Sequence, residues 1–243
     1  MATIPRLYVS ADLGGGAPVP LDEAQSKYLT RVLRLGIGDK VHVFNGRDGE
    51  WACKLANTSG RQALLEAERQ LRPQPTTTID LILAFAPLKK TRTDFVIEKA
   101  TELGISAIQP VRTQWTQSDR IRPERLQKIA LEAAEQTERL DLPEVRELIS
   151  LEVFLSDIEL GRTLYFCDEG GDAQPMRAAL EKANPNPAAI LIGPEGGFAP
   201  DERAQLRALD FVKPVTLGPR ILRAETAVVS ALTLWQAVLG DWD

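Results

Sequence analysis

The sequence predicts an α/β protein, with a small β-rich domain first and a larger domain built on a parallel sheet after it. Two patterns along the 243 residues indicate this division. Up to residue 72, short apolar runs alternate with the turn dipeptides Asn45-Gly46 and Asp48-Gly49, which is typical of antiparallel strands. From residue 79, apolar strand-like runs alternate with helical patterns, which is typical of a parallel sheet covered on both faces.

The first domain, residues 1–72, is predicted to be a small antiparallel barrel. It begins with the short strand RLYV. The segment LDEAQSKYLTRVLRL follows with helical spacing, which puts Leu29, Val32 and Leu33 on one face. Strand-like runs between Asn-Gly, Asp-Gly and Ser-Gly turns make up the rest. Residues 73–78 contain two prolines within RPQPTTT and no periodicity, and are predicted to be a linker.

The second domain, residues 79–243, is predicted to alternate strands with helices. The strands are expected at 79–85, 107–111, 163–167, 188–193 and 213–217, and the helices at 92–103, 123–139, 174–183, 200–208 and 224–239. The last helix is apolar on more than one face, which predicts a homodimer interface or a helix wholly buried in its own subunit. Its apolar residues include Val228, Val229, Ala231, Leu232, Leu234, Trp235, Val238 and Leu239.

The bulk composition predicts a cytoplasmic protein. The hydrophobic content of 44% and charged content of 26% are ordinary for a globular chain. No apolar run approaches the roughly 20 residues of a membrane span, and the first residues do not resemble a signal peptide. Cys53 and Cys167 lie in separate strand-like segments, so neither a disulfide framework nor a metal site is expected.

The charge distribution is uneven, although the net charge is −5. Residues 1–130 contain 19 Lys and Arg against 14 Asp and Glu, whereas residues 131–243 contain 10 against 20. This asymmetry is compatible with an anionic partner bound by the first half. A chance distribution of solvated charges explains it equally well.

Two glycine-proline loops follow predicted strands of the second domain, GPEGG at 193–197 and LGPRILRAETA at 217–227. Ligands of parallel sheets bind beyond the carboxyl ends of the strands, where such loops meet. GPEGG lacks the spacing of a phosphate-binding loop and contains an acid, which favours a neutral or cationic ligand. Each loop alone could equally be a turn that only ends its strand.

These loops, with EKATELGI (98–105), EAAEQTERLDLPEV (132–145) and VLRLGIGDKVHVFNG (32–46), closely resemble the RsmE family of the SPOUT superfamily. The resemblance spans nearly the whole chain. It implies a PUA-like RNA-binding barrel, an α/β domain with a C-terminal trefoil knot, and a homodimer. It also implies S-adenosylmethionine-dependent methylation of N3 of one uridine near the 3′ end of 16S ribosomal RNA in the small subunit.

The resemblance further implies that adenosylmethionine lies among three loops, here 166–170, 193–197 and 217–223. Glu195 is expected near its positive sulfonium. The expected cofactor-binding residues are Gly193, Glu195, Gly196, Gly197, Leu217, Gly218, Ile221, Leu222, Arg223, Thr226 and Ala227. Asp168 and Glu169 are candidates for ribose contacts, or else belong to a solvated loop.

Methyl transfer to N3 needs the imide proton removed, and a cation nearby would stabilise the resulting anion. The candidates for this catalytic role are Arg223 and Arg139. Arg139 could instead form a surface pair with Glu135. The expected phosphate contacts are Arg6, Lys27, Arg31, Arg34, Arg120, Arg122 and Arg125.

The chain departs from the family pattern at two places. Tyr28 stands where many relatives have histidine, and Trp115-Thr116 stands where they often have an arginine-serine pair. The tryptophans could stack on bases or simply pack. Other functions remain open: a non-catalytic RNA-binding relative, a SPOUT enzyme acting on transfer RNA, or a nucleotide-binding dehydrogenase. The missing phosphate fingerprint disfavours the dehydrogenase.

Overall fold

The computed structural model describes residues 4–58, 61–76, 79–118, 120–170, 172–183 and 187–242. The chain forms two compact units. The first contains Met1–Thr77 and Ala134–Leu142, and the second contains Thr78–Ala133 and Pro143–Asp243. The sequence patterns did not predict that residues 134–142 belong to the first unit. No helix of the described residues has the length and apolar character needed to cross a membrane.

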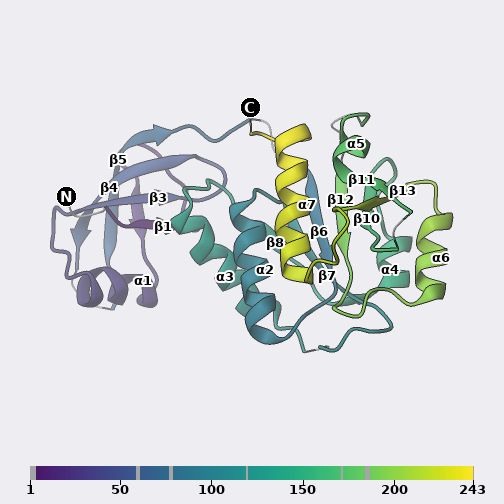
Figure 1. Ribbon diagram of the computed structural model, residues 1–243. Helices are drawn as coiled ribbons and strands as arrows, with labels where there is room; N and C mark the ends of the chain where they lie inside the picture. The colour runs from purple at the N-terminus through teal and green to yellow at the C-terminus, as the bar shows by residue number, and fades with distance from the viewer. Residues whose placement is uncertain are drawn as a thin grey trace. The chain divides into compact units, whose positions relative to one another are not determined.

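The first unit contains a curled five-stranded sheet (Figure 1). Its strands, in spatial order, are β1 (Arg6–Tyr8), β3 (Lys40–Phe44), β4 (Glu50–Asn57), β5 (Leu64–Arg72) and β2 (Pro18–Pro20). The prediction of a wholly antiparallel sheet is wrong at one place, because β1 pairs with β3 in parallel. β2 was not predicted; two of its three residues are prolines, which lack the N–H donor and therefore suit only an edge strand.

The helix of the first unit is shorter than its sequence pattern predicts. α1 (Glu23–Lys27) is capped by Asp22, whose side chain accepts a hydrogen bond from the backbone N–H of Gln25. The chain then continues as a π-helical turn, η1 (Tyr28–Val32). Its i→i+5 hydrogen bonding widens the turn, so the 3.6-residue spacing no longer applies. Leu29 is buried as predicted, but Val32 and Leu33 are 67% and 38% exposed.

A buried ion cluster fastens the 134–142 segment to the sheet. Arg6 donates through Nε to Glu50 at 2.6 Å and through Nη1 to the carbonyl of Ala134 at 2.8 Å. The guanidinium also lies over the Phe44 ring, 3.9 Å from its centroid. Arg6 is therefore a structural residue, and its predicted role as a phosphate contact is wrong because its side chain is only 9% exposed.

Glu50 is the acid at the centre of this cluster, with a side chain only 7% exposed. Burial alone would raise the pKa of Glu50, but hydrogen bonds from Arg6 and Arg72 outweigh it and lower the pKa below its usual value of 4.5. The stabilisation is therefore complete above that pH. It is lost as the pH falls through the lower pKa of the folded state.

We expect Glu50→Gln to destabilise the protein by about 3–5 kcal/mol near pH 7, because it leaves Arg6 buried without its carboxylate. The difference from the wild type should shrink in acid, where Glu50 is protonated. Urea unfolding near pH 7 and at about pH 3 measures both. The control is Glu66→Gln, on the neighbouring strand with a half-exposed pair to Lys54. Equal losses in the two variants would contradict the cluster's role.

The second unit is built on an all-parallel sheet (Figure 1). In spatial order its main path is β11 (Gln174–Pro175), β13 (Val212–Thr216), β10 (Thr163–Cys167), β12 (Ala188–Ile192), β6 (Leu81–Phe85), β7 (Ala107–Arg112) and β8 (Glu144–Val145); β9 (Ile149–Ser150) also pairs with β7. The helices are α2 (Lys90–Glu102), α3 (Pro123–Gln136), α4 (Leu151–Ser156), α5 (Met176–Leu180), α6 (Pro200–Ala208) and α7 (Ala224–Leu239).

All five predicted strands of this unit are present, and the prediction missed only short elements. These are the two-residue strands β8, β9 and β11 and the six-residue helix α4. Two predicted helices are shorter than expected. α3 ends before Glu138, which has a φ of 61°, a left-handed conformation that no helix can continue through. α5 covers only the middle of the predicted range 174–183.

The two faces of the sheet bury separate cores. On β6, Leu83 belongs to the core under α2, α5 and α7, whereas Ala84 belongs to the core under α4 and α6. The same alternation appears on β12, where Ile190 and Leu191 face opposite cores. Because side chains of a strand alternate between faces, uninterrupted apolar strands are what a sheet covered on both sides needs.

The strand order shows how the C-terminal part is threaded. β13 lies between β10 and β11, although β11 directly follows β10 in the chain. The connection from β10 to β11 therefore crosses the end of β13. This is the order expected when the last part of the chain passes through an earlier loop, as in the SPOUT fold that the resemblance implied. The loops after β10, β12 and β13 consequently meet at one edge.

Candidate functional site

A cavity of about 730 Å³ lies at the carboxyl ends of β10, β12 and β13. All three predicted loops contribute to its wall, and so does the start of α7. Eight of the eleven predicted cofactor-binding residues line it: Gly193, Glu195, Leu217, Gly218, Ile221, Leu222, Arg223 and Ala227. Gly196, Gly197 and Thr226 are not among the lining residues.

The loop after β12 is shaped by two glycines. Gly197 donates its N–H to the carbonyl of Pro194 at 2.9 Å and has a φ of 73°, which favours glycine. A side chain at Gly193 would meet the Phe198 ring at 2.5 Å, and Phe198 packs edge-on against Phe166. The positive φ of this loop occurs at Gly197 and not at Gly196.

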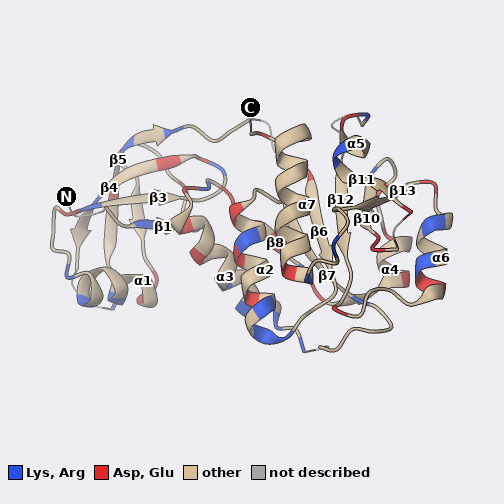
Figure 2. Ribbon diagram, in the orientation of Figure 1, with Lys and Arg blue, Asp and Glu red and all other residues tan. Residues whose placement is uncertain are grey.

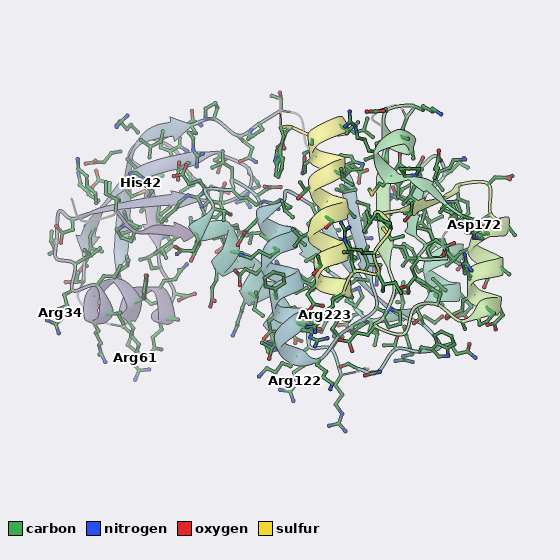
Figure 3. The ribbon with its side chains drawn as sticks, in the orientation of Figure 1. Arg34, His42, Arg61, Arg122, Asp172 and Arg223 are labelled. Carbon is green, nitrogen blue, oxygen red and sulfur yellow. The ribbon has the colours of Figure 1, made fainter. Side chains whose placement is uncertain are left out.

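Asp168 holds the loop after β10 against α6. Its carboxylate is buried and accepts hydrogen bonds from Arg203 and Arg207, at 2.8 Å and 2.7 Å from their Nε atoms. The same carboxylate accepts the backbone N–H of Gly170 at 3.0 Å. Asp172, labelled in Figure 3, pairs with the same two arginines. Asp168 therefore has a structural role, and its oxygens are already engaged.

Glu169 and Glu195 both line the cavity, but their surroundings differ. Glu195 forms an ion pair with Arg92 of α2, and Arg92 also lies 3.7 Å from a carboxylate oxygen of Glu225. Glu169 has no hydrogen-bonded or ion-pair partner within the described part of the chain. Burial raises the pKa of Glu169, Asp168 beside it raises it further, and Arg203 opposes both. Glu169, not Glu195, is the acid left to meet a ligand.

Two cations line the cavity without a partner acid among the described residues, Arg220 and Arg223. Arg223 immediately precedes α7, where its carbonyl accepts the N–H of Ala227 at 2.8 Å. Figure 2 shows basic and acidic residues together at this first turn of α7, and Figure 3 labels Arg223 there. A guanidinium in this position could stabilise negative charge that develops on a bound molecule.

Arg139, the other catalytic candidate, does not line this cavity. It belongs to the first unit, where its guanidinium donates to Asp141 at 3.0 Å and 3.2 Å. The carboxylate of Glu135, its alternative partner, accepts the backbone N–H of Tyr8.

The predicted phosphate contacts fall into two groups. Lys27 pairs with Glu23 at 2.6 Å, and Arg125 pairs with Asp94 through two hydrogen bonds of 2.6 Å and 2.9 Å. The second group is exposed and makes no ion pair within the described ranges. Its members are Arg31, Arg34, Arg120 and Arg122.

Arg92 and Phe198 are among the cavity-lining residues that sequence reasoning missed. Arg92 is about a hundred residues from its partner Glu195, so no local spacing could have linked them. Phe198 directly follows GPEGG, and an apolar residue after a glycine loop was a usable signal. Cys167 also lines the cavity; burial raises the pKa of its thiol to about 12, so it stays protonated.

No group of three or more His, Cys, Asp or Glu side chains within the described residues could bind a metal ion. The two cysteines of the chain are both free.

Comparisons with known proteins match both units. Residues 75–236 match the family model of the RNA methyltransferase domain, and residues 21–68 match that of the RNA methyltransferase PUA domain. The ribosomal RNA small subunit methyltransferase E of Rickettsia conorii is 32% identical, over 93% of both chains. Its namesake from Synechocystis is 38% identical, over 96% of this chain and 78% of the relative.

Solved structures agree with these relatives. A ribosomal RNA small subunit methyltransferase E from Neisseria gonorrhoeae, bound to S-adenosyl methionine, superposes with a TM-score of 0.88 at 27% identity and covers 99% of this chain and 100% of its own. A putative methyltransferase from Legionella pneumophila, in complex with its bound cofactor SAM, gives 0.84 at 27% identity, over 97% and 98%. The chain belongs to the ribosomal RNA small subunit methyltransferase E family, an RNA methyltransferase family.

Proposed function

We propose that this protein transfers a methyl group from S-adenosylmethionine to N3 of one uridine in 16S ribosomal RNA. The observation that supports this most is the single cavity that the loops after β10, β12 and β13 form together. It lies in a chain whose relatives are named as small-subunit ribosomal RNA methyltransferases. Two alternatives left open by the sequence, a transfer RNA substrate and a loss of catalysis, predict different outcomes in the experiment below.

The cavity suits the cofactor in size and in chemistry. A volume of about 730 Å³ lies within the ~300–1,000 Å³ range of small-molecule sites. Apolar walls from Leu217 and Leu222 and backbone groups near Gly193 and Gly218 could bind the adenosine. Glu169 is the carboxylate we place beside the ribose hydroxyls or the cationic end of the cofactor.

This assignment predicts different effects of removing the two acids. Glu169→Gln should weaken the binding of adenosylmethionine about tenfold, because the variant loses a carboxylate that forms no ion pair with a described residue. Glu195→Gln should weaken this binding less, since Glu195 already forms an ion pair with Arg92. Isothermal titration with adenosylmethionine and with the neutral product S-adenosylhomocysteine measures both. A larger effect of Glu195→Gln on the cationic ligand would restore Glu195 as the residue facing the sulfonium.

The chemistry needs alignment more than acid–base help. Bound adenosylmethionine supplies an electrophilic methyl group on a sulfonium, which leaves as a neutral thioether. The protein must hold the uracil ring in line and exclude water. The N3 proton passes to a base in solvent before methyl transfer, which leaves negative charge on the imide. Arg223 at the cavity wall is the cation we assign to stabilise that charge.

The RNA partner would be bound by exposed arginines of both units. Arg31 and Arg34 supply them in the first unit, and Arg120 and Arg122 in the second. Arg34 and Arg61 point away from the first unit at the end where α1 lies (Figure 3). Arg61 is an exposed cation that the sequence analysis left out. A ribosomal RNA substrate places the reaction in the cytoplasm.

We also propose a homodimer through α7. One face of the helix is buried in its own unit, through Val228, Ala231, Leu232 and Trp235. Leu234, Val238 and Leu239 pack against the same core but stay partly exposed, and Val229 is also only partly buried, so part of the apolar surface of the helix is left for a second copy. Light scattering should give twice the monomer mass of 26.8 kDa.

Mass spectrometry of small-subunit RNA from cells with and without the protein tests the proposed function. We expect one N3-methyluridine to disappear when the protein is removed and to return on treatment with protein and adenosylmethionine. A lost methyl group in transfer RNA instead would identify a different substrate. Unchanged RNA, together with no binding of adenosylmethionine, would indicate a non-catalytic RNA-binding protein.

A further inference from the structure

Residues 112–118 and 120–122 combine one exposed aromatic ring with several exposed cations. Trp115 is 45% exposed, which is unusual for the largest apolar side chain. Arg112, Arg120 and Arg122 are exposed and make no ion pair with any described residue. Figure 3 shows Arg122 extending away from the second unit. An aromatic face among unpaired cations is the composition that binds single-stranded nucleic acid.

Trp115 is held in place by its own turn. Thr113 accepts the N–H of Thr116 through its carbonyl at 3.2 Å, and its N–H donates to the Thr116 hydroxyl at 2.8 Å. The buried carboxylate of Glu202 then accepts the N–H of Gln114 at 2.8 Å. The turn is thereby tied to the start of α6, and the exposed ring needs little further ordering before it binds.

The ring lies against the loop that lines the cavity. A methyl group added at Gly196 would be 3.7 Å from Cε3 of Trp115, which is ordinary contact. Gly196 is outside the cavity wall, whereas its neighbour Glu195 is part of it. Trp115 is therefore next to the cavity without belonging to it, a position that suits a nucleotide adjacent to the one that is methylated.

We propose that Trp115 stacks on the base of an unpaired RNA nucleotide that flanks the target, while Arg112, Arg120 and Arg122 contact the phosphates around it. The proposal rests on the proposed function, because it names how that substrate is positioned. The cations favour RNA over a protein partner, because three exposed arginines that make no ion pair with a described residue suit the phosphates of a nucleic-acid backbone. Trp115 is a positioning residue in this scheme and takes no part in the chemistry.

The test compares Trp115→Ala with Trp115→Phe in steady-state methylation of small-subunit RNA. Loss of one stacked base should raise the KM for RNA roughly 5- to 150-fold, with kcat changed far less. Phe should restore most of the loss, because it keeps an aromatic face. The Kd of adenosylmethionine should stay within about twofold in both variants. The control is Trp242→Ala, a comparably exposed tryptophan near the C-terminus.

A second measurement separates stacking from phosphate contact. In binding of a single-stranded RNA oligonucleotide without cofactor, Trp115→Ala should weaken affinity and leave the salt slope unchanged, since stacking releases no counterions. Arg120→Gln with Arg122→Gln should flatten that slope. This assay works even if the wild type methylates no small-subunit RNA, so failure of the proposed function is recognised separately.

Two results would overturn the proposal. If Trp115→Ala weakens the binding of adenosylmethionine as much as the binding of RNA, the ring only shapes the cofactor loop. If neither the KM for RNA nor oligonucleotide affinity changes, Trp115 makes no contact with RNA.

Discussion

Arg223→Gln should lower kcat about 10²- to 10³-fold, the loss typical of removing one group that stabilises a developing anion. The affinity for adenosylmethionine should fall far less, because apolar and backbone groups make up much of the rest of the cavity wall. Arg223 is exposed at that wall and has no partner acid among the described residues, so its charge is available to a substrate. Single-turnover methylation with saturating cofactor measures the effect on the chemical step.

The pH dependence of this variant distinguishes charge stabilisation from simple positioning. If Arg223 stabilises the N3 anion, the Gln variant should regain activity as the pH rises and more uracil loses its proton in solution. Arg223→Lys should retain part of the rate because it keeps the charge. A Gln variant that stays equally impaired at every pH would show that Arg223 only positions the RNA.

The cofactor loops could be predicted because the residues that mark them are close together in the sequence. Gly-Pro pairs directly after apolar strands mark strand ends, and parallel strands bring their carboxyl ends to one edge. That reasoning placed residues as far apart as Gly193 and Gly218 around one cavity. It did not show which glycine of GPEGG takes a positive φ, because this depends on the turn that Pro194 and Gly197 close.

The roles of the charged residues could not be assigned from sequence, because the role of a charged side chain depends on the partner that it meets in the fold. Arg6 was indistinguishable from Arg31 as a basic residue of the first domain, yet one is buried with Glu50 and the other is exposed. The ion pair of Glu195 could not be predicted for the same reason, because its partner Arg92 lies far from it in the chain. The threading of β13 between β10 and β11 was likewise invisible to periodicity, which reports elements and not their order in space.

Ala227→Phe should abolish measurable binding of adenosylmethionine, a loss of at least about 100-fold, or roughly 2.7 kcal/mol. Ala227 is on the first turns of α7 and lines the cavity, so a phenyl ring there would occupy space that the cofactor needs. Because the ring can enter this space, the free energy of unfolding should fall by little more than roughly 1–3 kcal/mol, the usual cost of an overpacked site. Isothermal titration and thermal unfolding measure the two effects on the same samples.

Thr226→Phe is the matched control, because it adds a ring to the same helix one residue away. Thr226 was predicted to bind the cofactor, but it is exposed and does not line the cavity. We therefore expect Thr226→Phe to bind adenosylmethionine nearly as the wild type does. Loss of binding in both variants would mean that the cofactor site extends over the outer face of α7. Full binding by Ala227→Phe would place the cofactor outside this cavity, and the three-loop site would then have to be abandoned.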